Sequence, residues 1–169
     1  MLLHAFADFA AGEAMLEIAD IGQIPQYAGE TSTRHESEVL GLQQALAVAD
    51  AAVLATPEFN HSFSGAIKNA IDWTSMPASG SVWAGKPVAV VGAASSFVGT
   101  ARAQPHLRQV LFGLGAQVFP FPELLVNNSY AKFHEGTLVD EDTAARVSHY
   151  VLEFVRWVRI VKDWKPKMS

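Results

Sequence analysis

The sequence predicts one α/β domain over residues 1–169, in which helices cover both faces of a parallel β-sheet. Two apolar runs, residues 51–55 and 88–91, contain no polar side chain. Such runs are typical of parallel strands that are buried on both faces. Helical patterns separate the runs, and parallel strands need a crossover connection of this kind. The alternation of strand and helix therefore predicts the fold class.

Apolar periodicity and turn residues predict the elements of the first half. Leu2, Phe6 and Phe9 stand at i, i+4 and i+7, which predicts a helix with one apolar stripe. Gly12 is a suitable residue to end it. The rest of this half is predicted as a short strand over 15–19, a loop over 20–37, a helix over 38–49 and the strand over 51–55.

The second half continues the alternation. Ser62 or Ser64 can cap the next helix, whose inward side is formed by Ile67, Ala70, Ile71 and Thr74. Pro105 must kink the following helix, residues 101–114, or delay its start. The remaining elements are predicted as a strand over 88–91, a strand over 117–119, an irregular segment over 127–137 and a last helix over 142–162.

Composition excludes several classes of protein. The chain has 169 residues, half of them apolar and 17% charged, which is typical of a globular domain. It has no cysteine, so a disulfide framework and a thiolate metal site are excluded. A net charge of −5 argues against nucleic acid or an anionic membrane as partner. Without a spanning apolar run or a signal-peptide pattern, we expect a cytoplasmic protein.

Ligands of open α/β sheets bind at the carboxyl ends of the strands, and two such ends carry distinctive loops here. The first loop and its helix, residues 56–73, read TPEFNHSFSGAIKNAIDW. The second lies within residues 85–111, which read GKPVAVVGAASSFVGTARAQPHLRQVL. A third segment, residues 133–143, reads FHEGTLVDEDT before the last helix.

Together these segments resemble the NADPH-dependent FMN reductase family, which includes flavin, quinone, azo-dye and chromate reductases. The family pattern is close to TPEYNxSxPGxLKNAIDW, followed by GKPVA, a Gly/Ser loop and GGxRAQxxLR. The resemblance covers nearly the whole chain from Met15 onward. It implies a flavodoxin-like parallel sheet with helices on both faces and the strand order 2-1-3-4-5.

The resemblance also implies a binding site for FMN. The predicted cofactor-binding residues are Pro57, Glu58, Phe59, Asn60, His61 and Ser62 on the first loop, and Ala94, Ser95, Ser96 and Gly99 on the second. Backbone groups of the first loop would line the ring and the ribityl chain. Because a flavin itself carries the hydride chemistry, we predict no catalytic acid–base residue and no metal site.

Departures from the family pattern affect individual residues of the site. Phe59 replaces the family Tyr, and His61 stands where Gly is usual. His61 either contacts the nicotinamide or the acceptor, or is a solvent-facing loop histidine. Glu58 is interpreted as a loop carboxylate whose backbone binds the cofactor, rather than as a general base.

The family normally begins with a strand and a phosphate loop of the form GSxRxxSxN, whereas Met1 here falls inside the first helix. We therefore expect the first strand to be missing and FMN to bind weakly. Losing three charge-assisted hydrogen bonds of roughly 1.5–3 kcal/mol each costs about three to six orders of magnitude in affinity. Three explanations are open: the functional protein is longer, a short form binds flavin weakly or with a partner, or another loop holds the phosphate. In the third explanation, the candidate phosphate-binding residues are Ser95, Ser96, Thr100 and Arg102.

The resulting function is an NAD(P)H-dependent FMN oxidoreductase that passes electrons to a quinone, a flavin or a similar small acceptor. The alternatives are a non-catalytic assembly subunit, and an FMN electron carrier or redox sensor. We expect a homodimer or homotetramer. Leu152, Val155 and Trp157 widen the apolar face of the last helix, which is either buried against a second subunit or packed on the core.

Overall fold

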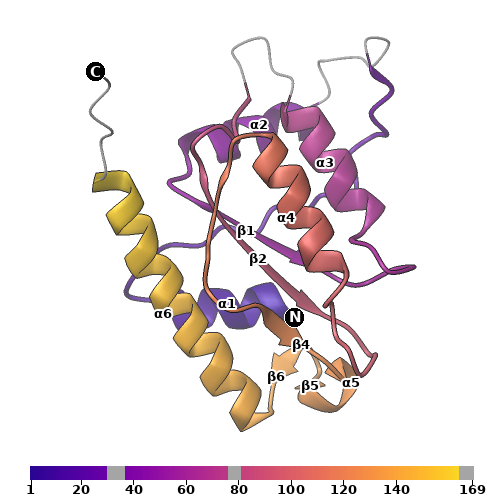
Figure 1. Cartoon of the computed structure of the whole chain (residues 1–169), viewed down its shortest axis with the longest axis vertical. Helices are drawn as coiled ribbons and strands as arrows, with labels where there is room; N and C mark the ends of the chain where they lie inside the picture. The colour runs from indigo at the N-terminus through magenta and orange to yellow at the C-terminus, as the bar shows by residue number, and fades with distance from the viewer. Residues whose placement is uncertain (30–36, 76–80, 164–169) are drawn as a thin grey trace.

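A parallel sheet lies at the centre of the computed structural model, which describes residues 1–29, 37–75 and 81–163 (Figure 1). Its strands are β1 (Ala52–Thr56), β2 (Pro87–Ala93), β3 (Gln117–Val118) and β4 (Leu124–Val126). β2 pairs with β1 along one edge and with both β3 and β4 along the other. The α/β class and the parallel pairing are therefore confirmed. β3 corresponds to the strand predicted over residues 117–119, whereas β4 was not predicted.

Helices cover both faces of β2. They are α1 (Leu2–Ala10), α2 (Ser37–Val48), α3 (Gly65–Ser75), α4 (Ala103–Gly113) and α6 (Glu141–Asp163). Ala89 and Val91 of β2 pack with α1 and α6, while Val88 and Val90 pack with α3 and α4. Successive side chains of a strand point to opposite faces, so this short apolar run contributes to two cores. Figure 1 shows α3 and α4 side by side, with α2 beside α3.

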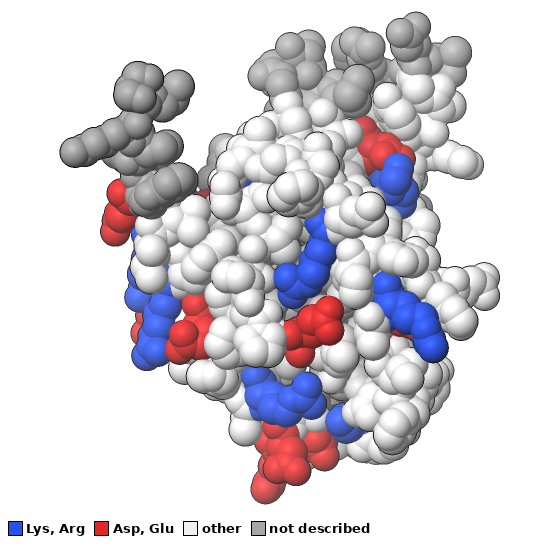
Figure 2. Space-filling model, viewed as in Figure 1, with Lys and Arg blue, Asp and Glu red and all other residues white. Residues whose placement is uncertain are grey.

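The last helix belongs to the core of the chain itself. Phe119 lies 5.3 Å from Tyr150, 5.4 Å from Phe154 and 5.2 Å from Trp157, measured between ring centroids. Val155 packs against the same cluster. Of the two interpretations of this apolar face, the structure supports packing on the core for Val155 and Trp157. Figure 2 shows acidic and basic side chains interspersed on the face that α4 and α6 share.

The predicted strand over residues 15–19 is wrong. Residues 14–20 belong to no strand, and the side chain of Met15 is 98% exposed. Strand-forming residues adopt a strand only where a neighbouring ladder supports them. Within the described residues, β1 forms a ladder with β2 alone. Residues 14–20 therefore do not pair with the outer edge of β1, and no ladder supports a strand there.

The irregular segment predicted over residues 127–137 contains short regular elements. They are α5 (Ser129–Lys132) and an antiparallel pair, β5 (Phe133–His134) and β6 (Thr137–Leu138). Glu135 and Gly136 form the turn of that pair, and both have positive φ. None of the helices in the described part of the chain has the length and apolarity needed to cross a membrane.

Tyr150 provides a test of this core. Its hydroxyl donates a hydrogen bond to the carbonyl of Val90 at 3.3 Å, and burial raises its pKa to about 12. The unfolded chain ionises first, near the ordinary value of 10.0. Tyr150 therefore contributes stability that is fully present below that pH and is lost as the pH rises towards 12.

We expect Tyr150→Phe to lower the free energy of unfolding by about 0.5–1.5 kcal/mol at neutral pH. The alkaline loss of stability should also be shallower in the variant than in the wild type. Urea unfolding at a series of pH values measures both effects. Parallel curves for the two proteins above the ordinary tyrosine pKa would contradict the assignment.

Candidate functional site

Two loops lie side by side at the carboxyl edge of the sheet. β1 ends at Thr56 and β2 ends at Ala93, and the register pairs Thr56 with Gly92. The chain therefore leaves both strands at the same level. The predicted cofactor-binding residues lie within 57–62 and 94–99, and both segments lie at this edge. The two loops are thus neighbours, and their sharing of one binding site stays a prediction.

The first loop forms a tight turn. Phe59 and Ser62 exchange two backbone hydrogen bonds, each 2.9 Å long. Asn60 and His61 between them have φ values of 47° and 66°, as in the two-residue turns of β-hairpins. Both are exposed, and so is 62% of Phe59. The turn presents its backbone and the His61 side chain to solvent.

Thr56 and Ser64 fix the base of that turn. The Thr56 hydroxyl donates to the carbonyl of Pro57 at 2.7 Å and accepts the backbone N–H of Ser64 at 3.2 Å. Ser64 Oγ accepts the N–H of Ile67 at 3.3 Å. Of the two predicted caps, Ser64 is therefore the one that caps α3. Ser62 instead places its hydroxyl 3.4 Å from Nδ1 of His106 on α4.

The second loop rests on the segment that follows β4. The N–H of Ala94 donates to the carbonyl of Val126 at 2.9 Å, and the N–H of Asn128 donates to the carbonyl of Ser96 at 3.2 Å. Gly99 is buried against the same segment with a φ of 61°. Ser95 and Ser96 remain exposed. Sequence reasoning did not include this supporting segment in the site.

Glu58 connects the two loops. Its Oε2 accepts the backbone N–H groups of Arg102 at 2.9 Å and Ala103 at 3.1 Å, at the start of α4. Its Oε1 lies 3.4 Å from the Arg102 guanidinium. The carboxylate side chain is 7% exposed. Burial by itself raises the pKa of Glu58, but the hydrogen bonds from Arg102 and Ala103 outweigh burial, so the pKa lies below its ordinary value. The interpretation of Glu58 as a loop carboxylate agrees with this position.

The same contact argues against a phosphate at this helix start. The Glu58 carboxylate occupies the N–H groups of Arg102 and Ala103, and its negative charge repels an anion. Thr100 is fully buried, and its hydroxyl accepts from Gln104 at 3.0 Å. The Ser96 hydroxyl donates to the carbonyl of Gly99 at 3.2 Å. These contacts argue against a phosphate at the N–H groups of Arg102 and Ala103, and the alternative built on Ser95, Ser96, Thr100 and Arg102 stays a prediction.

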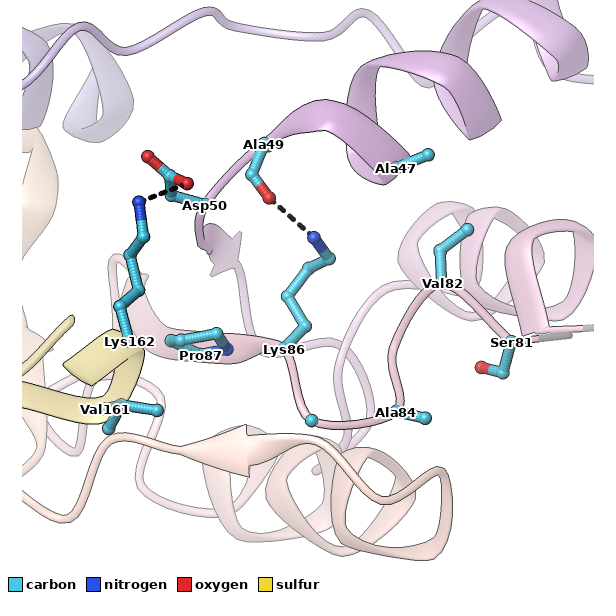
Figure 3. Close-up of a pocket in the computed structure, with 11 residues that line it drawn as sticks. Ala47, Ala49, Asp50, Ser81, Val82, Ala84, Lys86, Pro87, Val161 and Lys162 are labelled. Atoms are coloured by element: carbon cyan, nitrogen blue, oxygen red, sulfur yellow. Dashed lines mark hydrogen bonds and ion pairs between the residues drawn. The ribbon is translucent and has the colours of Figure 1, made fainter. Parts of the chain in front are cut away.

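A recess of about 490 Å³ lies at the other end of the strands, away from the two loops (Figure 3). Lys86 donates to the carbonyl of Ala49 at 2.6 Å, and Lys162 pairs with Asp50 at 2.6 Å. Burial lowers the pKa of Lys86, although Asp50 opposes this. Both lysines that line the recess thus have partners within the chain. The described residues contain no group of three or more side chains arranged to hold a metal ion.

The parallel sheet covered on both faces, with two exposed loops at its carboxyl edge, defines a flavodoxin-like α/β protein. Within that class, a family model described as NADPH-dependent FMN reductase matches residues 1–131. The chain belongs to this family. The matched residues include the motifs of both loops.

Relatives with assigned activities cover most of the chain. The 2-hydroxy-1,4-benzoquinone reductase of a Burkholderia species is 35% identical over 159 residues, which are 94% of this chain and 87% of the relative. The NAD(P)H-dependent FMN reductase PA1204 of Pseudomonas aeruginosa is 36% identical over 146 residues, 85% of this chain and 78% of that protein.

Among solved structures, FerB of Paracoccus denitrificans, a flavoenzyme NAD(P)H:(acceptor) oxidoreductase, superposes with a TM-score of 0.84. It is 32% identical, and the match covers 94% of this chain and 88% of FerB. The predicted fold class, the oxidoreductase activity and the use of FMN and NAD(P)H are confirmed for the family to which the chain belongs. The cofactor-binding residues stay predictions.

Gly92 lies near the end of β2, close to Thr56 of β1 and to Thr100. A Cβ atom there would lie 2.6 Å from the Thr56 carbonyl oxygen and would overlap the Thr100 side chain. We expect Gly92→Ala to lower the free energy of unfolding by about 1–3 kcal/mol, because the strand ends must move apart. Gly41→Ala is the control, since a Cβ at Gly41 in α2 meets nothing within 4 Å and alanine favours a helix by about 1 kcal/mol. Chemical denaturation of both variants is the measurement, and equal effects would contradict the close approach.

His61 is held in a backbone conformation that favours glycine. Its φ of 66° costs an ordinary residue about 1–2 kcal/mol. Glycine avoids this cost, but part of the gain is cancelled because glycine loses more entropy on folding. We expect His61→Gly to raise the free energy of unfolding by about 0.5–1 kcal/mol. Asn60→Gly should change it less, because asparagine tolerates this region. Thermal and urea unfolding of the pair are the readouts, and an equal or larger gain from Asn60→Gly would refute the argument.

Proposed function

We propose that this chain, as a single domain, passes electrons from NAD(P)H through FMN to a quinone, with the flavin ring lying on the two loops at the carboxyl edge of β1 and β2. One observation carries the proposal: both loops turn exposed backbone outward at adjacent strand ends. The family's chemistry then needs no side chain of this chain to donate or accept a proton. Bound FMN supplies the hydride-accepting group.

The donors of the two loops fit the polar edge of a flavin ring. Within the described residues, the backbone N–H groups of Asn60, His61, Ser95 and Ser96 have no hydrogen-bond partner in the chain. The carbonyl oxygens and ring nitrogens of an isoalloxazine accept hydrogen bonds from such neutral donors. A buried donor without a partner costs free energy, so a ring that covers these groups must satisfy them. This donor set supports the flavin assignment.

The proposed cofactor-binding residues are Pro57, Glu58, Phe59, Asn60, His61 and Ser62, with Ala94, Ser95, Ser96 and Gly99. The turn of the first loop orients the ring edge, and the second loop covers a side of the ring. Phe59 and Phe97 are 62% and 88% exposed, and they can shield the ring from water. Their aromatic faces also suit a planar acceptor.

A quinone is the proposed acceptor because relatives carry that activity in their names, including the benzoquinone reductase of Burkholderia and quinone reductases of Pseudomonas putida and Escherichia coli. We further propose a homodimer or homotetramer in the cytoplasm. Exposed apolar side chains such as Phe112 and Tyr130, which are 80% and 84% exposed, support self-association. The family's use of NAD(P)H supports a cytoplasmic location.

The experiment is a titration of the purified 169-residue chain with FMN, followed by addition of NAD(P)H and then of a benzoquinone. We expect saturable quenching of flavin fluorescence, bleaching of the flavin's visible absorption by NAD(P)H, and recovery of that absorption when the quinone is added. The affinity is expected to be weak, because the start of α4 is closed to the phosphate by Glu58.

Two outcomes overturn the proposal in different ways. Flavin binding without bleaching by NAD(P)H would indicate an electron carrier or redox sensor. A folded, self-associating chain that binds no FMN at micromolar concentration would indicate an assembly subunit. Serum albumin titrated in parallel controls for non-specific quenching.

A further inference from the structure

The start of α4 lacks a cap of its own. Arg102 occupies the N-cap position, and its side chain makes no capping hydrogen bond. Helix caps are normally Ser, Thr, Asp or Asn, whose side chains accept the first N–H groups of the helix. Here Glu58, which lies 44 residues earlier in the chain, accepts those of Arg102 and Ala103. The cap of the helix therefore comes from the neighbouring loop.

This cap is also the main link between the loops beyond the sheet. The β1–β2 ladder ends at the pair Thr56 and Gly92. Past that point, the hydrogen bonds that join the two loops in the described part of the chain are those of Glu58 and a longer contact of 3.4 Å between Ser62 and His106. Most of the hydrogen bonds between the loops thus involve the Glu58 carboxylate.

We propose that Glu58 is a positioning residue for the flavin. By capping α4 from the first loop, its carboxylate fixes the distance between the two loops that flank the ring. It thereby sets both the affinity for FMN and the rate of flavin reduction, without contacting the reacting atoms. The inference rests on the proposed function, because it assumes that the ring lies on these loops.

The charges around Glu58 support this role. Arg102 lies 3.4 Å from the carboxylate, and its own side chain is 51% exposed. His106 on α4 and His61 on the turn are titratable groups on the elements that meet here, and both are exposed. Removing the carboxylate leaves two N–H groups and a cation at a helix start without their anion, a change that weakens the junction. The loops are then free to separate.

The experiment compares Glu58→Gln and Glu58→Ala with Glu153→Gln as the matched control. Glu153 pairs with Arg156 at 2.7 Å on the exposed side of α6, so its substitution removes a carboxylate away from the loops. For each protein we measure the FMN dissociation constant, the rate of flavin reduction by NAD(P)H at saturating FMN, and the melting temperature. Circular dichroism establishes that each variant is folded.

We expect Glu58→Ala to weaken FMN binding about tenfold or more and to slow reduction at saturating FMN by a similar factor. Glu58→Gln should lie between Glu58→Ala and the wild type, because an amide oxygen still accepts an N–H but carries no charge. The control should match the wild type in both flavin readouts. If Glu58→Ala lowers the melting temperature yet leaves affinity and rate unchanged, Glu58 has a structural role alone and the inference is overturned.

Amide hydrogen exchange separates failure of this inference from failure of the proposed function. In the flavin-free protein, Glu58→Ala should accelerate exchange at Arg102 and Ala103, and Glu153→Gln should not. A wild-type chain that binds no flavin overturns the proposed function, whatever the exchange result. A wild-type chain that binds flavin, with unchanged exchange and affinity in Glu58→Ala, overturns the positioning role and leaves the proposed function intact.

Discussion

The complete burial of β2 is the constraint on which the rest of the structure depends. Val88 to Val91 are all 0% exposed, and their side chains divide between a core with α1 and α6 and a core with α3 and α4. A strand in this position cannot shift its register by one residue, because every side chain would then face the wrong core. The register places Thr56 opposite Gly92, which in turn places the two loops of the candidate site side by side.

The sequence was most informative where burial is strongest. The uninterrupted apolar run of β2 and the inward stripe of α3 follow from burial alone, so they are readable without neighbours. The run of β1 also predicted a strand, although Ala52 to Ala55 are only half-buried rather than buried on both faces. Residues 15–19 illustrate the opposite case. Their composition suits a strand, but a strand also needs a hydrogen-bonding partner, and that partner is a property of the fold. β4 was missed because three residues carry too little periodicity to be recognised.

The sequence predicted where the candidate site lies but not its internal contacts. The motif letters located both loops, and the rule for ligands at the carboxyl edge of a sheet gave their common location. The cap of α4 by Glu58 spans 44 and 45 residues of sequence, and no local pattern reports a contact over that distance. The type of turn at His61 was also hidden, because a histidine in place of the usual glycine carries no signal for positive φ.

The electrostatics of this edge limit the ligand it can hold. A helix start ordinarily attracts anions through its free N–H groups and its dipole. In α4, Glu58 already accepts the N–H groups of Arg102 and Ala103. The same hydrogen bonds keep the pKa of Glu58 low. The groups left to a ligand are neutral backbone donors and exposed aromatic side chains. Such groups suit a planar, neutral ring better than a phosphate, which supports the proposal that the flavin ring lies on this edge. Binding energy from a phosphate must come from outside this junction.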